Sequence, residues 1–169
     1  VLPGAPGPQG LILAPTRELA IQDAEALHSY GRYLGVHVAP VYGGQSIERQ
    51  FRVLSRGVDA VVATPGRLMD HIRRGTLTLE HVRMVVLDEA DEMLNMGFVE
   101  DIEFILEQLP AEHQTALFSA TMPARVRALA NKYLKEPQQV TVSQDRLTVP
   151  NVRQVYYDVV GRDRADVLG

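Results

Sequence analysis

Short runs of apolar residues recur along the chain, and longer stretches with a different periodicity separate them. The runs fall at residues 10–14, 36–42, 58–64, 82–88, 115–120 and 138–142. Several are rich in Val and apolar at successive positions, which is typical of strands buried on both faces of a parallel sheet. Each run therefore predicts a β-strand.

Between the runs, apolar residues return every three or four positions, as they do on the inner face of an α-helix. The predicted faces are Leu19, Ala20, Ala24, Leu27 and Leu34, then Ile47, Phe51 and Leu54, then Phe98, Ile102, Ile105 and Leu109, and finally Val126, Leu129, Ala130 and Tyr133. Thr16 and the pair Thr64–Pro65 are typical of helix starts, and Pro123 opens the last helix in the same manner. Alternating strands and helices predict an α/β fold, with a parallel sheet and helices on both of its faces.

Residues 143–151 are mostly polar and include a proline, unlike the alternating runs before them. We expect one domain over residues 1–142, a polar linker over 143–151, and the beginning of a second domain over 152–169. Residue 1 is Val, and the first ten residues show neither the basic nor the apolar region of a signal peptide. We therefore expect a piece of a longer chain, with the cytoplasm as its default setting.

Composition narrows the classes of function. The chain has 169 residues, 46% of them hydrophobic, and no apolar run long enough to cross a bilayer. Cysteine is absent, which excludes disulfides and thiolate metal sites, and the five histidines lack the spacing of a zinc site. With a net charge of −4, a nucleic-acid site would have to be local. Arg greatly outnumbers Lys, which suits phosphate recognition but equally reflects a GC-rich genome.

Polar residues gather where predicted strands end, which is where ligands bind in open α/β sheets. Asp88 ends one strand and could hold Mg²⁺ beside phosphates, and Glu89 could activate a water molecule. Asp91 and Glu92 follow at a helix start, where acidic residues are common for structural reasons alone.

Further strand ends carry hydroxyl, glycine and Arg residues. Ser119 and Thr121 follow the fifth run and could bond a neighbouring carboxylate, although such residues also form ordinary turns. The segments 14–20 and 63–67 each place Pro, Thr and Arg where a strand meets a helix, as a phosphate contact or a simple cap would. Gly43–Gly44 could admit a nucleic-acid backbone or make a turn.

Taken together, these segments resemble a known family. APTRELA, YGG, ATPGRLMD, VLDEADEML, MGF and FSATMP occur in the order and roughly the spacing of the first RecA-like domain of DEAD-box ATP-dependent RNA helicases. The resemblance covers about residues 10 to 160, and residues 138–169 resemble the family's interdomain linker and the first strand of its second RecA-like domain.

The resemblance implies ATP and Mg²⁺ as cofactors, RNA as the partner, and a role for each matching residue. Asp88 would hold the magnesium of MgATP through water, Glu89 would activate the hydrolytic water, and Asp91 would connect this site to Ser119 and Thr121. Those two residues would help to couple hydrolysis to unwinding. The RNA backbone would lie against Pro15, Thr16, Arg17, Gly43, Gly44, Thr64, Pro65, Gly66 and Arg67.

Three parts of the family pattern do not occur in this sequence. These are the glutamine motif and the phosphate-binding loop A-x-x-G-x-G-K-T upstream of PTRELA, and most of the second RecA-like domain. We therefore expect the chain alone to bind ATP weakly or not at all and not to unwind RNA. Because the strand of that loop is an interior strand in the family, we also expect the chain to be marginally stable, to self-associate, or to be completed by a separate piece of the same protein. A non-catalytic RNA-binding or assembly module and a motor acting on DNA stay open as alternatives.

Overall fold

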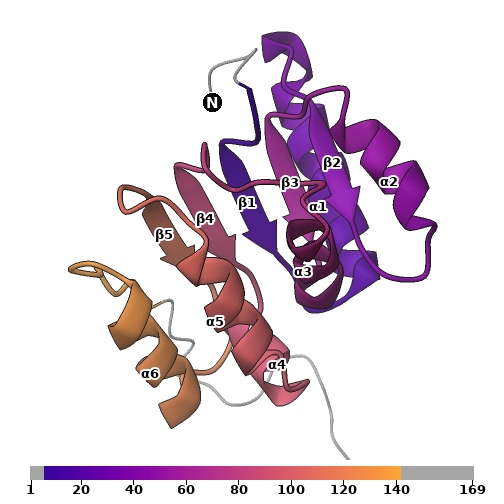
Figure 1. Ribbon diagram of the computed structural model, residues 1–169. Coiled ribbons are helices and arrows are strands. Elements are labelled where there is room, and N and C mark those ends of the chain that lie inside the picture. The colour runs from indigo at the N-terminus through magenta and orange to yellow at the C-terminus, as the bar shows by residue number, and fades with distance from the viewer. Residues whose placement is uncertain (1–5, 142–169) are drawn as a thin grey trace, which may run out of the picture. The chain divides into compact units, whose positions relative to one another are not determined.

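A five-stranded parallel sheet forms the centre of the molecule in the computed structural model, which describes residues 6–141 (Figure 1). Its strands are β1 (Gly10–Leu13), β2 (Val38–Val41), β3 (Ala60–Ala63), β4 (Met84–Leu87) and β5 (Gln114–Leu117). Their order is β2-β3-β1-β4-β5, and every neighbouring pair is parallel. The predicted α/β class with a parallel sheet is confirmed.

The last predicted strand does not form in the described part of the chain. Residues 138–141 have no regular structure, and residue 142 lies outside the described residues. One compact unit ends at Pro137 and a second begins at Gln138. The predicted linker over 143–151 and the beginning of a second domain over 152–169 also lie outside the described residues, so both stay predictions.

Helices connect the strands at the predicted places. They are α1 (Arg17–Gly31), the 3₁₀ turn η1 (Arg32–Leu34), α2 (Ile47–Leu54), α3 (Pro65–Arg73), α4 (Ala90–Asn95), α5 (Val99–Glu107) and α6 (Ala124–Tyr133). The buried faces of α5 and α6 match the prediction, since Ile102, Ile105, Val126 and Leu129 all lie in the core.

Two predicted inner-face residues lie outside. Leu34 is 72% exposed because α1 ends at Gly31 and the chain turns through η1 before Gly35, whose φ of 68° only glycine adopts readily. On α2, Phe51 is exposed and the neighbouring Gln50 is buried instead. A polar side chain therefore takes an inner position of α2 that the apolar pattern could not identify.

The predicted helix starts are mostly confirmed. Thr16 caps α1, since its Oγ1 accepts a hydrogen bond from the N–H of Leu19 at 3.2 Å. Pro65 is the first residue of α3, but the hydroxyl of Thr64 makes no cap hydrogen bond. Pro123 stands at the cap position of α6 rather than inside the helix, as its extended backbone shows.

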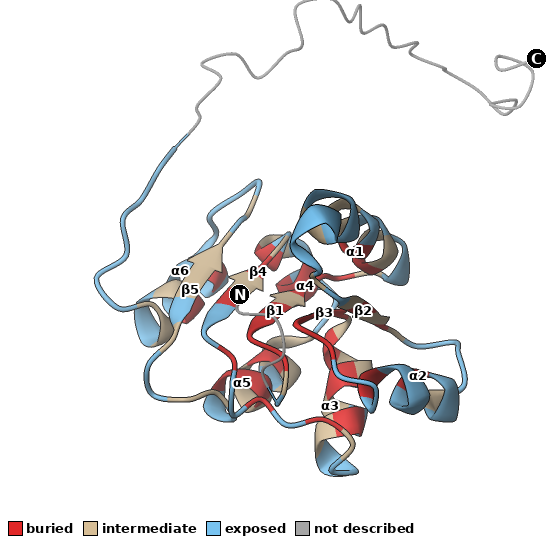
Figure 2. Cartoon of the chain, turned by 90° about the horizontal axis from the view of Figure 1, so that it is seen from above, coloured by how far each residue is buried: buried red, intermediate tan, exposed pale blue. Residues whose placement is uncertain are grey.

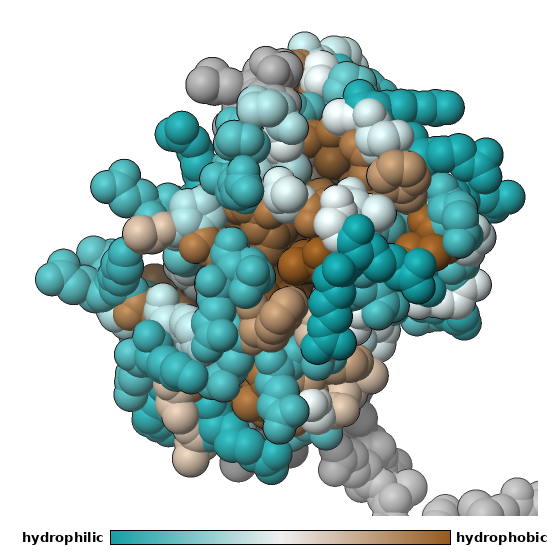
Figure 3. Space-filling model, viewed as in Figure 1, coloured by the Kyte–Doolittle hydropathy of each residue, from teal (hydrophilic) through white to brown (hydrophobic). Residues whose placement is uncertain are grey.

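The helices cover the two faces of the sheet unequally (Figure 2). In the described part of the chain, α1 alone packs on one face, where Ala20 and Ala24 meet Val62. Helices α2 to α6 all contribute side chains to the larger core on the other face, built around Leu11, Val61 and Val85. Figure 3 shows this second face, where hydrophobic residues lie between the hydrophilic side chains of the helices.

The five strands end at one level. Leu13 pairs with Ala63 and with Leu87, and these two pair in turn with Val41 and Leu117, the last residues of β2 and β5. All strands run the same way, so the loops that follow them leave the sheet side by side. Because of this register, motifs that are far apart in the sequence lie together at the carboxyl end of the sheet.

The sheet has no gap between its strands, so its two free edges are the outer sides of β2 and β5 in the described residues. Burial falls toward β5: all four residues of β3 are buried, whereas no residue of β5 is. Phe118, directly after β5, is 58% exposed. Among residues 6–141 no helix has the length and apolarity needed to span a membrane.

Candidate functional site

The strand order sorts the candidate residues into two groups. The acidic and hydroxyl residues Asp88, Glu89, Asp91, Ser119 and Thr121 follow the adjacent strands β4 and β5. The other candidates, Pro15, Thr16, Arg17, Gly43, Gly44, Thr64, Pro65, Gly66 and Arg67, follow β1, β2 and β3, which are also adjacent. At the carboxyl end of the sheet, the loops that carry the carboxylates therefore lie beside the loops that are suited to phosphate binding.

The end of β4 holds two carboxylates in a fixed backbone. The N–H of Asp88 donates to the carbonyl of Leu13 at 2.9 Å, which anchors the residue to β1. Glu89 has φ 48° and ψ 51°, a left-handed conformation that is costly for a residue with a side chain. Its N–H donates to Asp88 Oδ1 at 3.0 Å, and its side chain is exposed. Such strain is common at functional sites, where it aims a side chain.

Asp91 joins the loops after β4 and β5. Its Oδ2 accepts hydrogen bonds from the N–H of Thr121 at 2.9 Å and from the Thr121 hydroxyl at 2.5 Å. Its own N–H donates to Ser119 Oγ at 3.2 Å, and that hydroxyl donates to the carbonyl of Thr121 at 2.6 Å. The Thr121 hydroxyl, with a smaller contribution from Ser119, holds the pKa of Asp91 below its usual value. Asp91 is thus an ionised link between two strand ends.

A cavity of about 380 Å³ lies between α1 and the uncovered part of the sheet. Its lining is mostly apolar, with Ile12, Val86 and Phe118 from the sheet side and the carboxylates of Asp23 and Asp88 as its charged groups. Asp88 therefore faces a space large enough for a small ligand. Because Phe118 directly precedes Ser119, the same cavity adjoins both strand ends.

Asp23 is a residue that the sequence analysis missed. It lies on α1, its Oδ2 atom is buried, and that atom has no hydrogen-bond partner. Burial raises the pKa of the Asp23 carboxyl, and the negative charges of Asp88 and Glu89 raise it further. The signal was present in the helical spacing, since position 23 lies three residues after Ala20 and four before Leu27 on the inner face.

We expect Asp23→Asn to stabilise the fold at pH 7 by about 1 kcal/mol, because it removes a charge that the native state holds unfavourably. A raised native pKa means that the native state gains its proton first as the pH falls. The gain should therefore shrink as the pH falls through the raised native pKa and disappear below about pH 4, the usual carboxyl value. Thermal unfolding at pH 7 and pH 4 measures it. Glu25→Gln, an exposed change on the same helix, is the control, and an equal gain in both variants would contradict the assignment.

The loop after β1 presents an exposed cation. Pro15 is buried at the junction, and Thr16 uses its hydroxyl as the cap of α1. The Arg17 side chain is 63% exposed and pairs with Glu18 at 2.5 Å. A Cβ added to Gly44 would lie 3.6 Å from Arg17 Nη1, so the loops after β1 and β2 are neighbours. Because Arg17 and its partner Glu18 are both exposed, Arg17 can reach an anion in solvent by leaving this surface pair.

The loops after β2 and β3 form the rest of this group. Gly43 and Gly44 are exposed, and Gly44 has φ 83°, which favours glycine. Thr64 donates its N–H to the carbonyl of Val41 at 3.0 Å, which ties the start of α3 to the end of β2. Arg67 differs from Arg17, since its side chain is only 14% exposed and points into the protein.

Comparison with known proteins agrees with this arrangement. Residues 2–129 match the model of the DEAD/DEAH box helicase family. The DEAD-box ATP-dependent RNA helicase CshA of Geobacillus kaustophilus is 56% identical over 160 residues, which are 95% of this chain and 34% of that protein. The ATP-dependent RNA helicase DeaD of Buchnera aphidicola is 54% identical over 162 residues, which are 95% of this chain and 27% of that protein. The chain thus spans about a third of the length of the curated relatives it matches.

Solved structures give the same answer for the fold. A DEAD box protein from Methanococcus jannaschii superposes with a TM-score of 0.75 at 47% identity, over 78% of this chain and 36% of that one. A hypothetical ATP-dependent RNA helicase from Sulfolobus tokodaii gives a TM-score of 0.74 at 41% identity, over 78% of this chain and 40% of that one. The sheet is RecA-like, and the chain belongs to the DEAD/DEAH box helicase family.

Proposed function

We propose that the chain is part of the core of an ATP-dependent RNA helicase, in which ATP hydrolysis is coupled to local unwinding of an RNA duplex. The observation that carries this proposal is the link from Asp91 to Ser119 and Thr121. A carboxylate that is bonded to a second strand end can pass a change at the nucleotide to another part of the molecule. A module without hydrolysis would gain nothing from a strained, exposed Glu89 beside this link.

ATP and Mg²⁺ fit the residues after β4. Mg²⁺ usually keeps several waters and binds one or two carboxylates together with substrate phosphates. Asp88 supplies such a carboxylate at the cavity, and the unpartnered Oδ2 of Asp23 adds negative charge to the lining. When bound, Mg²⁺ would offset the charge of the phosphates. Asp88 would hold it through water, and Glu89 would orient and deprotonate the attacking water.

RNA binding is assigned to the loops after β1, β2 and β3. Glycine-rich and helix-start backbone offers N–H groups to phosphate oxygens, with Arg17 as the exposed cation. Contacts of this kind read backbone and shape rather than base sequence. A helicase that must act on many duplexes needs that independence. RNA rather than DNA as the partner remains a prediction from the resemblance, and the cytoplasm as the setting remains a prediction from the first ten residues, which lack the pattern of a signal peptide.

The missing phosphate-binding loop is assigned to the free edge of β5. No gap separates the described strands, so a further strand must add at an edge. The edge of β5 adjoins the carboxylate loops, its residues are poorly buried, and one face of β4 and β5 has no helix over it in the described residues.

Transplanting the chain tests the proposal. The chimera is G. kaustophilus CshA in which this chain replaces the matching segment of 160 residues, so that CshA supplies the rest of the helicase. We expect RNA-stimulated ATP hydrolysis and duplex unwinding from this chimera, measured with RNA and with DNA of the same sequence. A folded chimera without RNA-stimulated hydrolysis would refute the proposal. RNA binding without hydrolysis would instead indicate a non-catalytic module.

The chain by itself should behave differently. We expect no measurable RNA-stimulated ATP hydrolysis and a concentration-dependent mass above the 18.7 kDa of one copy. The physical reason is the row of unpaired backbone groups along β5, which other copies can pair. Analytical ultracentrifugation over a range of concentrations measures the association. A monomer that unfolds in one sharp transition would show that the edge needs no partner.

A further inference from the structure

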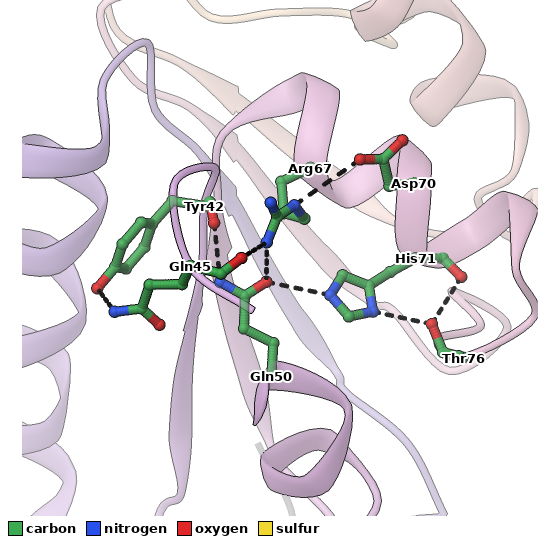
Figure 4. A network of polar contacts seen from close by, with 7 residues as sticks. All are labelled: Tyr42, Gln45, Gln50, Arg67, Asp70, His71 and Thr76. Atoms are coloured by element: carbon green, nitrogen blue, oxygen red, sulfur yellow. Dashed lines mark hydrogen bonds and ion pairs between the residues drawn. The ribbon is translucent and has the colours of Figure 1, made fainter. Parts of the chain in front are cut away.

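A buried polar network joins the loop after β2 to helices α2 and α3 (Figure 4). Its centre is formed by Gln50, which is 4% exposed, and His71, which is fully buried. His71 Nε2 lies 3.1 Å from Gln50 Oε1, and His71 Nδ1 lies 2.8 Å from the hydroxyl of Thr76. None of these three residues belongs to the motifs that suggested the function, yet the side chains of Gln50 and His71 are buried and all three make side-chain hydrogen bonds.

The hydrogen bonds fix the orientation of both central side chains. Gln50 Nε2 donates to the carbonyl of Tyr42 at 2.8 Å, so its Oε1 is the atom that faces His71 and Arg67. Because a carbonyl oxygen only accepts, His71 must carry its proton on Nε2. Burial, and then the charge of Arg67, hold the pKa of His71 below its usual value, so the ring stays neutral. His71 Nδ1 then accepts from the Thr76 hydroxyl, whose single proton is shared with the carbonyl of His71 at 3.0 Å.

Arg67 closes the network on the side of the loop. Its Nη1 donates to the carbonyl of Gln45 at 2.9 Å and to Gln50 Oε1 at 3.0 Å, and its Nε lies 3.7 Å from Asp70 Oδ2. The Arg67 side chain is 14% exposed and is engaged by Gln45, Gln50 and the exposed Asp70, so little of it faces a phosphate in solvent. This differs from the contact that the family resemblance implied for Arg67.

The network grips the glycine loop at both ends. The carbonyl of Tyr42, before Gly43, is held by Gln50, and the carbonyl of Gln45, after Gly44, is held by Arg67. Two exposed glycines, one of them at φ 83°, would otherwise be among the most mobile residues of the molecule. The side chains that hold them come from α2 and α3, so the loop is tied to both helices.

We propose that Gln50 and His71 are positioning residues for RNA binding, which act through Arg67 to hold the Gly43–Gly44 loop in place beside the start of α3. Arg67 is then an internal clamp and not a phosphate contact. This inference rests on the proposed RNA-binding function and names the residues that preorganise its surface. A preformed surface binds more tightly because less conformational freedom is lost on binding.

The test measures RNA affinity against salt concentration in the chimera with CshA. The variants are Arg67→Lys and Gln50→Met, with Arg73→Lys as the matched control on α3 and Arg17→Gln as the contrast. Lys keeps the charge but loses the planar fork, and Met keeps the length of Gln without its polar atoms. We expect the first two variants to bind RNA about tenfold more weakly with an unchanged salt dependence. Arg73→Lys should bind as the parent does.

Salt dependence separates a clamp from a phosphate contact. Each lost phosphate contact lowers the slope of log K against log salt by about 0.7 for single strands, which we expect for Arg17→Gln. The double variant of Arg67→Lys and Gln50→Met should be no weaker than either single variant, because both break the same connection. If the network only stabilised the fold, the variants would lower the melting temperature without weakening RNA binding in this non-additive way.

Several results would overturn the inference. Arg67→Lys binding RNA as the parent does would refute the clamp. A further variant, Arg67→Gln, removes the charge, and if it lowered the salt slope as Arg17→Gln does, Arg67 would be a direct contact. Amide hydrogen exchange at residues 43–46 gives an independent reading without RNA, and it should become faster in both variants. If Gln50→Met fails to fold, Arg67→Lys decides alone. A parent chimera that does not bind RNA would refute the proposed function itself, whereas a binding parent with unaffected variants would refute only the clamp.

Discussion

Glu89→Gln in the chimera with CshA should lower the rate of RNA-stimulated ATP hydrolysis by about 10²- to 10⁴-fold, the usual contribution of a positioned general base. The side chain is exposed beside the cavity that Asp88 lines, and the amide of Gln cannot take a proton from water. Gln has nearly the same shape, so the left-handed backbone of residue 89 should persist. Steady-state phosphate release with saturating RNA measures the effect.

The control for this prediction is Glu92→Gln. Glu92 is exposed and lies in the first turn of the same helix, α4, but it follows the link residue Asp91 and has no assigned role. We expect its hydrolysis rate to stay within about twofold of the parent, as for most surface substitutions. Hydrolysis by Glu89→Gln at a tenth of the parent rate or more would assign the base to another residue. RNA affinity should be equal in all three proteins, which shows that each variant is folded.

The sequence was sufficient for the fold because each strand carries its own signal. The run 58–64 is apolar at successive positions, and the strand that forms there, β3, is buried along its whole length. Cap residues placed the helix starts within a residue or two. The prediction for Leu34 was wrong because apolar periodicity does not show where a helix ends. Here α1 ends at Gly31, and the 3₁₀ turn η1 that contains Leu34 is capped by Gly35.

The sequence supplied candidate residues for the site but not the connections between them. Which loops are neighbours depends on the strand order β2-β3-β1-β4-β5, and no local pattern encodes that order. Arg17 and Arg67 look alike in sequence, yet one faces solvent and the other is held by Gln45 and Gln50. The spacing of apolar residues could not identify Gln50 as buried, because a buried polar residue is recognised only through its hydrogen-bond partners.

Removing the hydrogen bond between Thr121 and Asp91 should have the second large effect, a loss of duplex unwinding. Thr121→Val keeps the shape of the side chain but removes the hydroxyl that donates to Asp91 Oδ2 at 2.5 Å. A hydrogen bond to a charged group contributes about 1.5–3 kcal/mol, so its loss should lower the rate of duplex unwinding at least about tenfold. Hydrolysis of ATP should fall by no more than about threefold, since Asp88 and Glu89 are untouched. Parallel assays of unwinding and phosphate release on the chimera measure the two rates.

A double-mutant cycle with Asp91→Asn decides whether this effect passes through the carboxylate. Because the Thr121 hydroxyl lowers the pKa of Asp91, its stabilising contribution is present above the usual carboxyl pKa of about 3.9 and is lost as the pH falls through the lowered value. At pH 7 the bond is therefore at full strength, and Thr121→Val should cause a smaller further loss of unwinding once Asp91 is Asn, whose amide oxygen accepts only a weaker, uncharged hydrogen bond. Thr115→Val, within β5, is the matched control and should unwind as the parent does. Unwinding and hydrolysis that fall together in Thr121→Val would mean that this contact supports the ATP site alone, and that coupling runs elsewhere.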